Sequence, residues 1–445
     1  MFYYTENILF QKCIIWEGTG KLRVIQEKKT SKLFIMSKSK LKIYLDETVK
    51  DSELFKSKSE FEICKPEIFK YGIMVEEIPT HVVDSDFDYL QSKIPAYELL
   101  HSDFINVDLD KIENLSTDDR KKKTISEIIG VAVGIKYTVE LLNTNPNKFK
   151  KIGIPTNGKY LDYSLIVNNL EYELETKGTV SKYYSTFKKD ILEKKKSHSL
   201  KDVYLRFGTI AMINNPGDLK NSQCVVVDDP PDDKNRANDD SSYETQLLNY
   251  AMFLSYILDS KYYNKFVKPL KNKRLRRVII NQEKFFTQYD FNGKVYLGEC
   301  FDYRLIRDDL DTLKSNNLND LYNYKTEQYG KTKFFIGLDL DVIDAINSKN
   351  ENYLKGYESE WFYNENRKSY FFLDRDGILI VKSENGADFQ LENIFTEEEV
   401  KYRLSNSLNE KNGYSHKCGA PCTSRDIEGK PCEIRTYRKL CHFHR

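Results

Sequence analysis

The stretch LDYSLIVNNLEYELETKGT, residues 161–179, decides the fold of this chain. Its two apolar-rich runs are joined by Asn168–Asn169, a pair that favours the tight turn of a β-hairpin. Alternate residues of a strand face the same side of a sheet, so Glu175 and Lys177 are expected to project together. If the strands pair, Asp162 reaches the same place from the first strand. The stretch therefore predicts a hairpin that gathers two carboxylates and a lysine.

This group of side chains suits a hard divalent cation. Mg²⁺ prefers oxygen ligands, is bound by one or two carboxylates and keeps water molecules for contact with substrate. A neighbouring lysine can hold or deprotonate the attacking water and neutralise charge that builds up on a phosphate. An ionised carboxylate within a buried strand is costly unless it is paired or bound to metal, which favours this interpretation. The alternative is an exposed hairpin on which Glu175 and Lys177 are solvent-facing partners.

The segments around the hairpin complete an α/β unit. Before it, residues 117–146 place apolar residues at helical spacing between a Thr–Asp start and an Asn/Pro stop. After it come a lysine-rich helix at 181–201 and two apolar strands at 206–215 and 223–231. The order helix, hairpin, helix, strand, strand predicts a compact α/β fold over about residues 115–231.

This arrangement resembles the restriction-endonuclease-like superfamily of nucleases, which is known by an Asp…(Asp/Glu)-x-Lys motif. Here the motif is Asp162, twelve intervening residues, and then Glu175-Thr-Lys177. The resemblance extends to the downstream strands and to the preceding helix, where Ser126-Glu127 stands at the place of a glutamate that faces the metal site in many members. Leu161 replaces the proline that often precedes the aspartate, a residue with which the superfamily can dispense. In all, the resemblance covers roughly a quarter of the chain.

The resemblance implies a role for each motif residue. Asp162 and Glu175 are expected to ligate Mg²⁺ or Mn²⁺, with the Thr176 carbonyl as a further oxygen ligand. Lys177 is expected to act on the water that attacks the phosphorus. Glu127 is expected to supply another carboxylate, either behind the first metal or to a second one.

Outside this unit the sequence predicts further parts. Short runs of alternating apolar and polar residues predict a β-rich N-terminal domain at 1–112, and the nuclease core is expected at 113–240. A helical and mixed region follows at 241–410, and a zinc knuckle at 411–445.

Three local predictions fall in the mixed region. Residues 243–270 have helical periodicity and predict one helix, and the apolar run at 334–348 also predicts a helix. A hairpin is expected to turn at Asp376–Gly377. The aspartates of the 334–348 run are interpreted as a solvated face, and they are Asp339, Asp341 and Asp344.

The cysteine-rich tail predicts a structural zinc site. Three thiolates and an imidazole form a closed tetrahedral set, and the expected ligands are Cys418, Cys432, Cys441 and His444. Cys422 and His442 are surplus, so a set shifted to include one of them stays open. The N-terminal sequence lacks the pattern of a secretory signal, which favours metal over disulfides and a reducing cytoplasm. The tail resembles the short treble-type zinc knuckles appended to many bacterial and viral proteins.

The charge balance confines any nucleic-acid surface to a local patch, because 69 Lys+Arg against 68 Asp+Glu leave a net charge of +1. The best candidate is the run Lys261–Arg277, with eight basic residues and no acid. The phosphate-binding residues expected there are Lys271, Lys273, Arg274, Arg276 and Arg277. A solvated helix end is the alternative. The apolar stretches are too short to predict a membrane span.

Together these patterns predict a cytoplasmic, Mg²⁺-dependent endonuclease with DNA as its substrate. The resemblance also suggests a role in microbial or antiviral defence. One alternative is a nucleic-acid-binding module in which the nuclease fold is only a scaffold. Another is a subunit of a larger complex that cleaves only with a partner protein, and a homodimer stays open as well.

Overall fold

The computed structural model describes the following parts of the chain: residues 14–17, 21–24, 38–49, 53–75, 104–152, 160–197, 203–228, 242–258, 260–282, 287–301, 332–365, 369–384, 416–417 and 435–436. The chain divides into two compact units, residues 1–35 and residues 36–445. In the first unit, β1 (Ile14–Glu17) pairs antiparallel with β2 (Lys21–Val24). All elements discussed below belong to the second unit.

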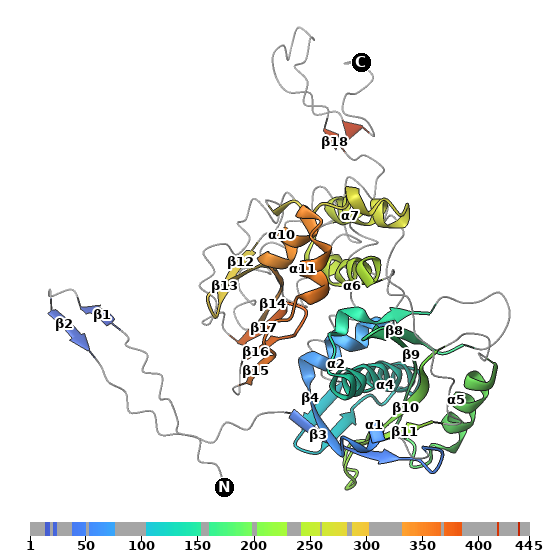
Figure 1. The fold of residues 1–445 in the computed structure, drawn as a ribbon. Coiled ribbons are helices and arrows are strands. Elements are labelled where there is room, and N and C mark those ends of the chain that lie inside the picture. The colour runs from blue at the N-terminus through green and yellow to red at the C-terminus, as the bar shows by residue number, and fades with distance from the viewer. Residues whose placement is uncertain are drawn as a thin grey trace. The chain divides into compact units, whose positions relative to one another are not determined.

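The motif lies in a mixed sheet to which the described residues contribute seven strands (Figure 1). Strands β9 and β10 run parallel, as do β11 and β3, and the other neighbouring strands are antiparallel. In spatial order the strands are β4 (Glu60–Cys64), β3 (Lys38–Leu45), β11 (Gln223–Val227), β10 (Leu205–Met212), β9 (Leu170–Thr179), β8 (Tyr163–Val167) and β7 (Lys150–Lys151). The sheet thus includes two strands from the stretch expected to form the N-terminal domain.

The predicted hairpin is confirmed. Strand β8 pairs antiparallel with β9, and Asn168 and Asn169 form the turn with φ angles of 53° and 60°. Both angles are left-handed, which asparagine tolerates and which matches the twist of the flanking strands. Strand β8 alternates buried and half-buried residues, whereas the middle of β9 is buried on both faces because helices cover both sides.

Helix α4 (Asp119–Leu142) covers one face of the sheet, as its sequence pattern predicted (Figure 1). The Asp118 side chain caps its first turn by accepting a hydrogen bond from the Lys121 backbone N at 2.8 Å, and Asn143 ends it with a left-handed φ of 45°. The helix comes unusually close to β9 at Gly130 and Gly178, since a Cβ on Gly178 would overlap the Ser126 carbonyl oxygen.

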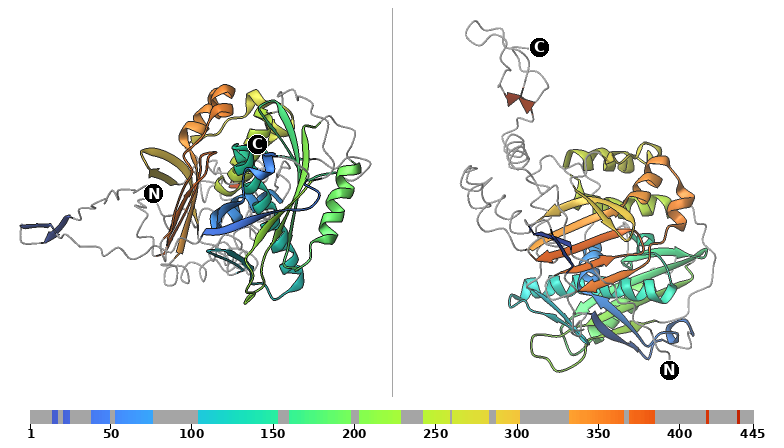
Figure 2. Two further views of the ribbon diagram at one scale, coloured as in Figure 1. Left: turned by 60° about the horizontal axis from the view of Figure 1, so that its bottom comes forward. Right: turned by 90° about the vertical axis from the view of Figure 1, so that its left-hand side faces the viewer.

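Helix α5 (Ser185–Ser197) covers the opposite face (Figure 2). Of the predicted lysine-rich helix at 181–201, residues 185–197 are helical, and Ile191 packs against Ile210, Val225 and Val227 of β10 and β11. It also lies tight against Gly208 of β10, where any Cβ would meet the Ile191 side chain.

The C-terminal half builds a second, antiparallel sheet. Six strands of the described chain lie in the order β12 (Thr287–Phe291), β13 (Lys294–Phe301), β14 (Thr332–Asp339), β17 (Ile378–Glu384), β16 (Tyr370–Leu373) and β15 (Phe362–Glu365). Helix α6 (Ser242–Ile257) contacts β13 and β14, and α2, α4 and α6 lie between the two sheets (Figure 2). The predicted hairpin at Asp376–Gly377 is confirmed, and Gly377 takes a φ of +81° there.

Two helix predictions for this half need correction. Residues 243–270 form two helices, α6 and α7 (Ser260–Lys271), instead of one. The run at 334–348 is a strand up to Asp339, the end of β14, followed by helix α10 (Leu340–Ser348). Asp339 is not on a solvated face, because it is 1% exposed and accepts hydrogen bonds from Tyr357 and Lys294, whereas Asp341 and Asp344 are exposed as expected.

Short elements complete the described chain. They are α1 (Glu53–Lys56), α2 (Lys65–Gly72), α11 (Glu351–Gly356), the 3-10 turns η1 (Ile73–Val75), η2 (Pro146–Lys148) and η3 (Leu275–Arg277), and the strand pairs β5 (Ile105–Asp108) with β6 (Lys111–Asn114) and β18 (His416–Lys417) with β19 (Arg435–Thr436). The fold is therefore of the α/β class, as predicted. Among the helices described, none has the length and apolar character needed to cross a bilayer.

Candidate active site

The structure brings the two motif carboxylates together at one end of the β8–β9 hairpin. The Asp162 backbone N donates a hydrogen bond to the Leu174 carbonyl at 3.1 Å, which sets Asp162 beside Glu175 on the neighbouring strand. The Asp162 side chain is 29% exposed, whereas that of Glu175 is fully buried. One carboxylate thus reaches solvent and the other lies beneath it.

Two lysines contact the same oxygen of Glu175. The Nζ atom of Lys177 lies 2.6 Å from Glu175 Oε1, and that of Lys194 on α5 lies 2.5 Å from it. Lys194 also lies 3.8 Å from Asp162 Oδ1, so it sits between the two carboxylates. Lys177 has a second acidic neighbour, Asp190 Oδ2 at 3.4 Å. Lys194 was not predicted as a site residue, although it lies on the apolar stripe of α5, three residues after Ile191.

Thr176 fixes the orientation of Asp162. Its backbone N and its Oγ1 both donate hydrogen bonds to Asp162 Oδ2, at 3.0 and 3.1 Å. These bonds leave Asp162 Oδ1 directed towards Lys194 and the site. The predicted contribution of this residue was its carbonyl oxygen, and the orienting role of the N–H and hydroxyl was not foreseen.

The donor set fits a divalent cation that is only partly coordinated by protein. Glu175 Oε2 is buried and has no hydrogen-bond partner, which is costly for an ionised carboxylate unless a cation meets it. Within the described ranges, no three His, Cys, Asp or Glu side chains are grouped to hold a metal by themselves. Two carboxylates with open positions match Mg²⁺, which keeps water and binds substrate phosphates, better than a closed structural ion.

The electrostatics of the site are unusual for a glutamate. Burial raises the pKa of Glu175 and the Asp162 carboxylate raises it further, while Lys177 and Lys194 lower it, so that the pKa is about 7. Burial lowers the pKa of Lys177, but the carboxylate and hydrogen bond of Glu175 outweigh this and raise it above its usual value. Lys177 is therefore an ammonium at neutral pH, whereas Glu175 is poised between its two forms.

Glu127 is exposed on α4, and the structure records no hydrogen bond or ion pair from it to Asp162 or Glu175. The buried phenol of Tyr163 has a pKa well above the usual value, raised first by burial and then by the charges of Asp162, Glu175 and Glu127. Glu127 follows Ser126, whose carbonyl oxygen lies against Gly178 of β9.

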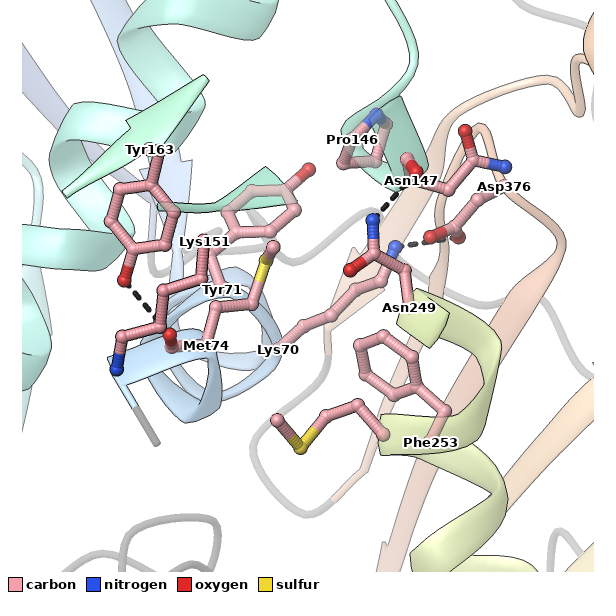
Figure 3. Close-up of a pocket in the computed structure, with 11 residues that line it drawn as sticks. Lys70, Tyr71, Met74, Pro146, Asn147, Lys151, Tyr163, Asn249, Phe253 and Asp376 are labelled. Carbon is pink, nitrogen blue, oxygen red and sulfur yellow. Dashed lines mark hydrogen bonds and ion pairs between the residues drawn. The ribbon is translucent and has the colours of Figure 1, made fainter. Parts of the chain in front are cut away.

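A pocket lies on the α2 face of the sheet, with Tyr163 as one wall (Figure 3). The Tyr163 hydroxyl donates a hydrogen bond to the Met74 carbonyl there. Lys70 closes the opposite side and contacts Asp376 at 2.5 Å, and it also contacts Asp374 at 2.5 Å. None of the pocket-lining residues belongs to the Asp…Glu-x-Lys motif.

The other predicted site residues are distributed as follows. Lys271, Lys273, Arg274, Arg276 and Arg277 are all exposed at the end of α7 and in η3. The expected zinc ligands Cys418, Cys432, Cys441 and His444, and the surplus Cys422 and His442, lie outside the described residues. Comparison of the chain with models of protein families, with curated proteins and with solved structures found no match.

Proposed function

We propose that this protein is a metal-dependent nuclease that hydrolyses phosphodiester bonds in DNA. The observation that carries the proposal is the group formed by Asp162, Glu175 and Lys177, with a buried Glu175 oxygen that has no hydrogen-bond partner. Paired carboxylates beside an ammonium are suited to phosphoryl chemistry, which requires a cation and a neutralising group close to the reacting phosphate. The match of this group to the motif of the restriction-endonuclease-like superfamily supports the same conclusion.

The residues divide the work as follows. Asp162 and Glu175 hold the metal, which when bound stabilises the charge of the reacting phosphate and acidifies a water molecule. Thr176 keeps Asp162 in its orientation through two hydrogen bonds. Lys177 is protonated, so it holds the attacking water and neutralises phosphate charge without itself accepting the proton. The resemblance assigns Glu127 a further carboxylate role, and the support for it from the structure is its position on α4, one residue after the crossing with Gly178.

The exposed basic run at the end of α7 supports a nucleic-acid substrate. Five basic side chains there are exposed, and phosphates bind such groups with release of counterions. A triple variant with alanine at Lys273, Arg276 and Arg277 is expected to bind DNA more weakly and to reduce the dependence of log affinity on log salt by about 3. An unchanged salt dependence excludes this run from the DNA interface.

The same run is the observation that favours the second candidate, a nucleic-acid-binding module without catalysis. The decisive experiment incubates supercoiled plasmid and single-stranded DNA with the protein in Mg²⁺, Mn²⁺ or EDTA. Lys177→Ala is compared with Lys189→Ala, a matched change at a lysine of α5 whose side chain is 79% exposed. We expect metal-dependent cutting that Lys189→Ala retains and Lys177→Ala loses.

Cutting that survives Lys177→Ala places the activity elsewhere and contradicts the proposal. Metal-independent, salt-sensitive binding without cutting favours the binding module. Cutting that appears only after a partner protein is added favours a subunit of a larger complex. A cytoplasmic role in microbial or antiviral defence, proposed on the resemblance, would fit any outcome that includes DNA cleavage.

A further inference from the structure

Lys194 occupies the place between the two carboxylates where the proposed metal is expected. Its Nζ lies 2.5 Å from Glu175 Oε1 and 3.8 Å from Asp162 Oδ1. A divalent metal held by the same two carboxylates would need this space. The side chain of Lys194 is 19% exposed, so its charge acts in a partly desolvated setting.

The position of Lys194 is built into the fold, because several contacts hold helix α5 against the sheet. Asp46, at the end of β3, accepts a hydrogen bond from the Tyr184 hydroxyl at 3.0 Å and contacts Lys188 Nζ at 2.8 Å. Lys195 Nζ, itself buried, lies 2.5 Å from Asp228 Oδ1. Gly208 lets Ile191 approach β10, and Lys194 lies one turn further along the same face of α5.

The balance of charge around Asp162 and Glu175 favours a second lysine at this position. Asp162 and Glu175 bring two negative charges to one place, and Lys177 alone can neutralise only one of them. Lys177 is shared with Asp190 Oδ2 at 3.4 Å, so Lys194 supplies the positive charge that lies next to both Asp162 and Glu175 in the absence of metal. A divalent ion that binds the same oxygens would add two positive charges next to two ammoniums, and like charges at this distance repel.

We propose that the Lys194 ammonium holds the cation position of the candidate active site in the metal-free protein and is displaced when a divalent metal binds. This inference rests on the proposed function. In the absence of metal, the Lys194 ammonium keeps the buried Glu175 carboxylate paired. It also sets a threshold of metal concentration below which the site stays closed by the protein's own cation.

The test measures Mn²⁺ binding by calorimetry on the full chain without DNA, for the wild type, Lys194→Met and Lys189→Met. Lys194→Met removes the charge and keeps most of the length, and Lys189→Met makes the same change at an exposed position of α5. We expect Lys194→Met to bind Mn²⁺ roughly tenfold more tightly, as for removal of one nearby like charge. Mn²⁺ should also raise the melting temperature of this variant more than that of the wild type.

Lys194→Arg keeps the positive charge and provides a second measurement if Lys194→Met does not fold. It should bind Mn²⁺ no more tightly than the wild type, and a gain in affinity there overturns the inference. Equal or weaker binding by a folded Lys194→Met also overturns it. If the wild type binds Mn²⁺ and Glu175→Gln does not, the metal site stands even when the displacement fails. If neither the wild type nor Lys194→Met binds Mn²⁺, the proposed function fails as well.

Discussion

Replacing Glu175 with glutamine is expected to remove a loss of stability that the metal-free protein undergoes as the pH rises from 5 to 8. The glutamine has nearly the shape of the protonated acid and removes the cost of a buried charge. The pKa of Glu175 lies at about 7 in the folded protein, against an ordinary value of 4.5. A pKa raised on folding adds stability that is fully present below pH 4.5 and is lost as the pH rises through 7. The wild type therefore loses stability in this window, and Glu175→Gln does not.

The magnitude follows from the shift. A difference of about 2.5 pKa units, at about 1.4 kcal/mol per unit, gives about 3 kcal/mol by pH 8. With an unfolding entropy of about 2.1 cal/mol/K per residue over the whole chain, this corresponds to a change of about 3 °C, from acid to alkaline pH, in the difference between the melting temperatures of Glu175→Gln and the wild type.

The assay compares melting temperatures of the wild type, Glu175→Gln and Glu193→Gln in EDTA between pH 5 and pH 8. Glu193 is exposed on α5 and serves as the matched control. The gap between Glu175→Gln and the wild type should open with pH, and saturating Mn²⁺ should close or reverse it, because metal favours the ionised form. A gap that is constant across this range, or that narrows with rising pH, refutes the reasoning about the buried carboxylate.

Three other changes test the crossing of α4 with β9, the buried ion pairs of Lys70 and the predicted zinc ligands of the tail. Gly178→Ala should destabilise the protein by about 3 kcal/mol, since its methyl group would overlap backbone of α4, whereas Gly356→Ala, where nothing lies within 4 Å, should be neutral in the same urea titration. Lys70→Met should lower the free energy of unfolding, measured by urea titration, by about 3–5 kcal/mol, because the buried Asp374 and Asp376 lose their cation. Replacing both aspartates with asparagine in the same variant should recover much of this loss. Cys418→Ser should lower the zinc content measured by atomic absorption and leave melting of the main sheet unchanged, and an unaltered content would remove this residue from the ligand set.

The β8–β9 hairpin could be predicted because its determinants are local. An Asn–Asn pair favours a left-handed turn, and strand alternation sets which residues share a face. Helix α4 could be predicted in the same way from the capping residues at its start and the Asn/Pro residues at its end. The run at 334–348 was not, since a short apolar segment fits a strand or a buried helix by periodicity alone.

Only part of the candidate site could be predicted from the sequence. Asp162, Glu175 and Lys177 share one hairpin, so their spacing could be read directly. Lys194 comes from another element, and it looked like one more charge in a solvated lysine run. Its place in the stripe formed with Tyr184, Phe187 and Ile191 is the signal that could have identified it as inward-facing.

The buried contact of Lys70 with Asp374 has a consequence for synthesis of the chain. The two residues are 304 positions apart. Similarly, strand β3 can join the sheet only after β11, its parallel neighbour, has been synthesised. During translation Lys70 therefore has no counter-ion from this aspartate until the β16–β17 hairpin has left the ribosome. An unneutralised lysine is poorly accommodated in a core. We expect the hairpin that bears the motif to form early, its sheet to be completed once β11 has emerged, and the Lys70–Asp374 contact to form only when the β16–β17 hairpin arrives.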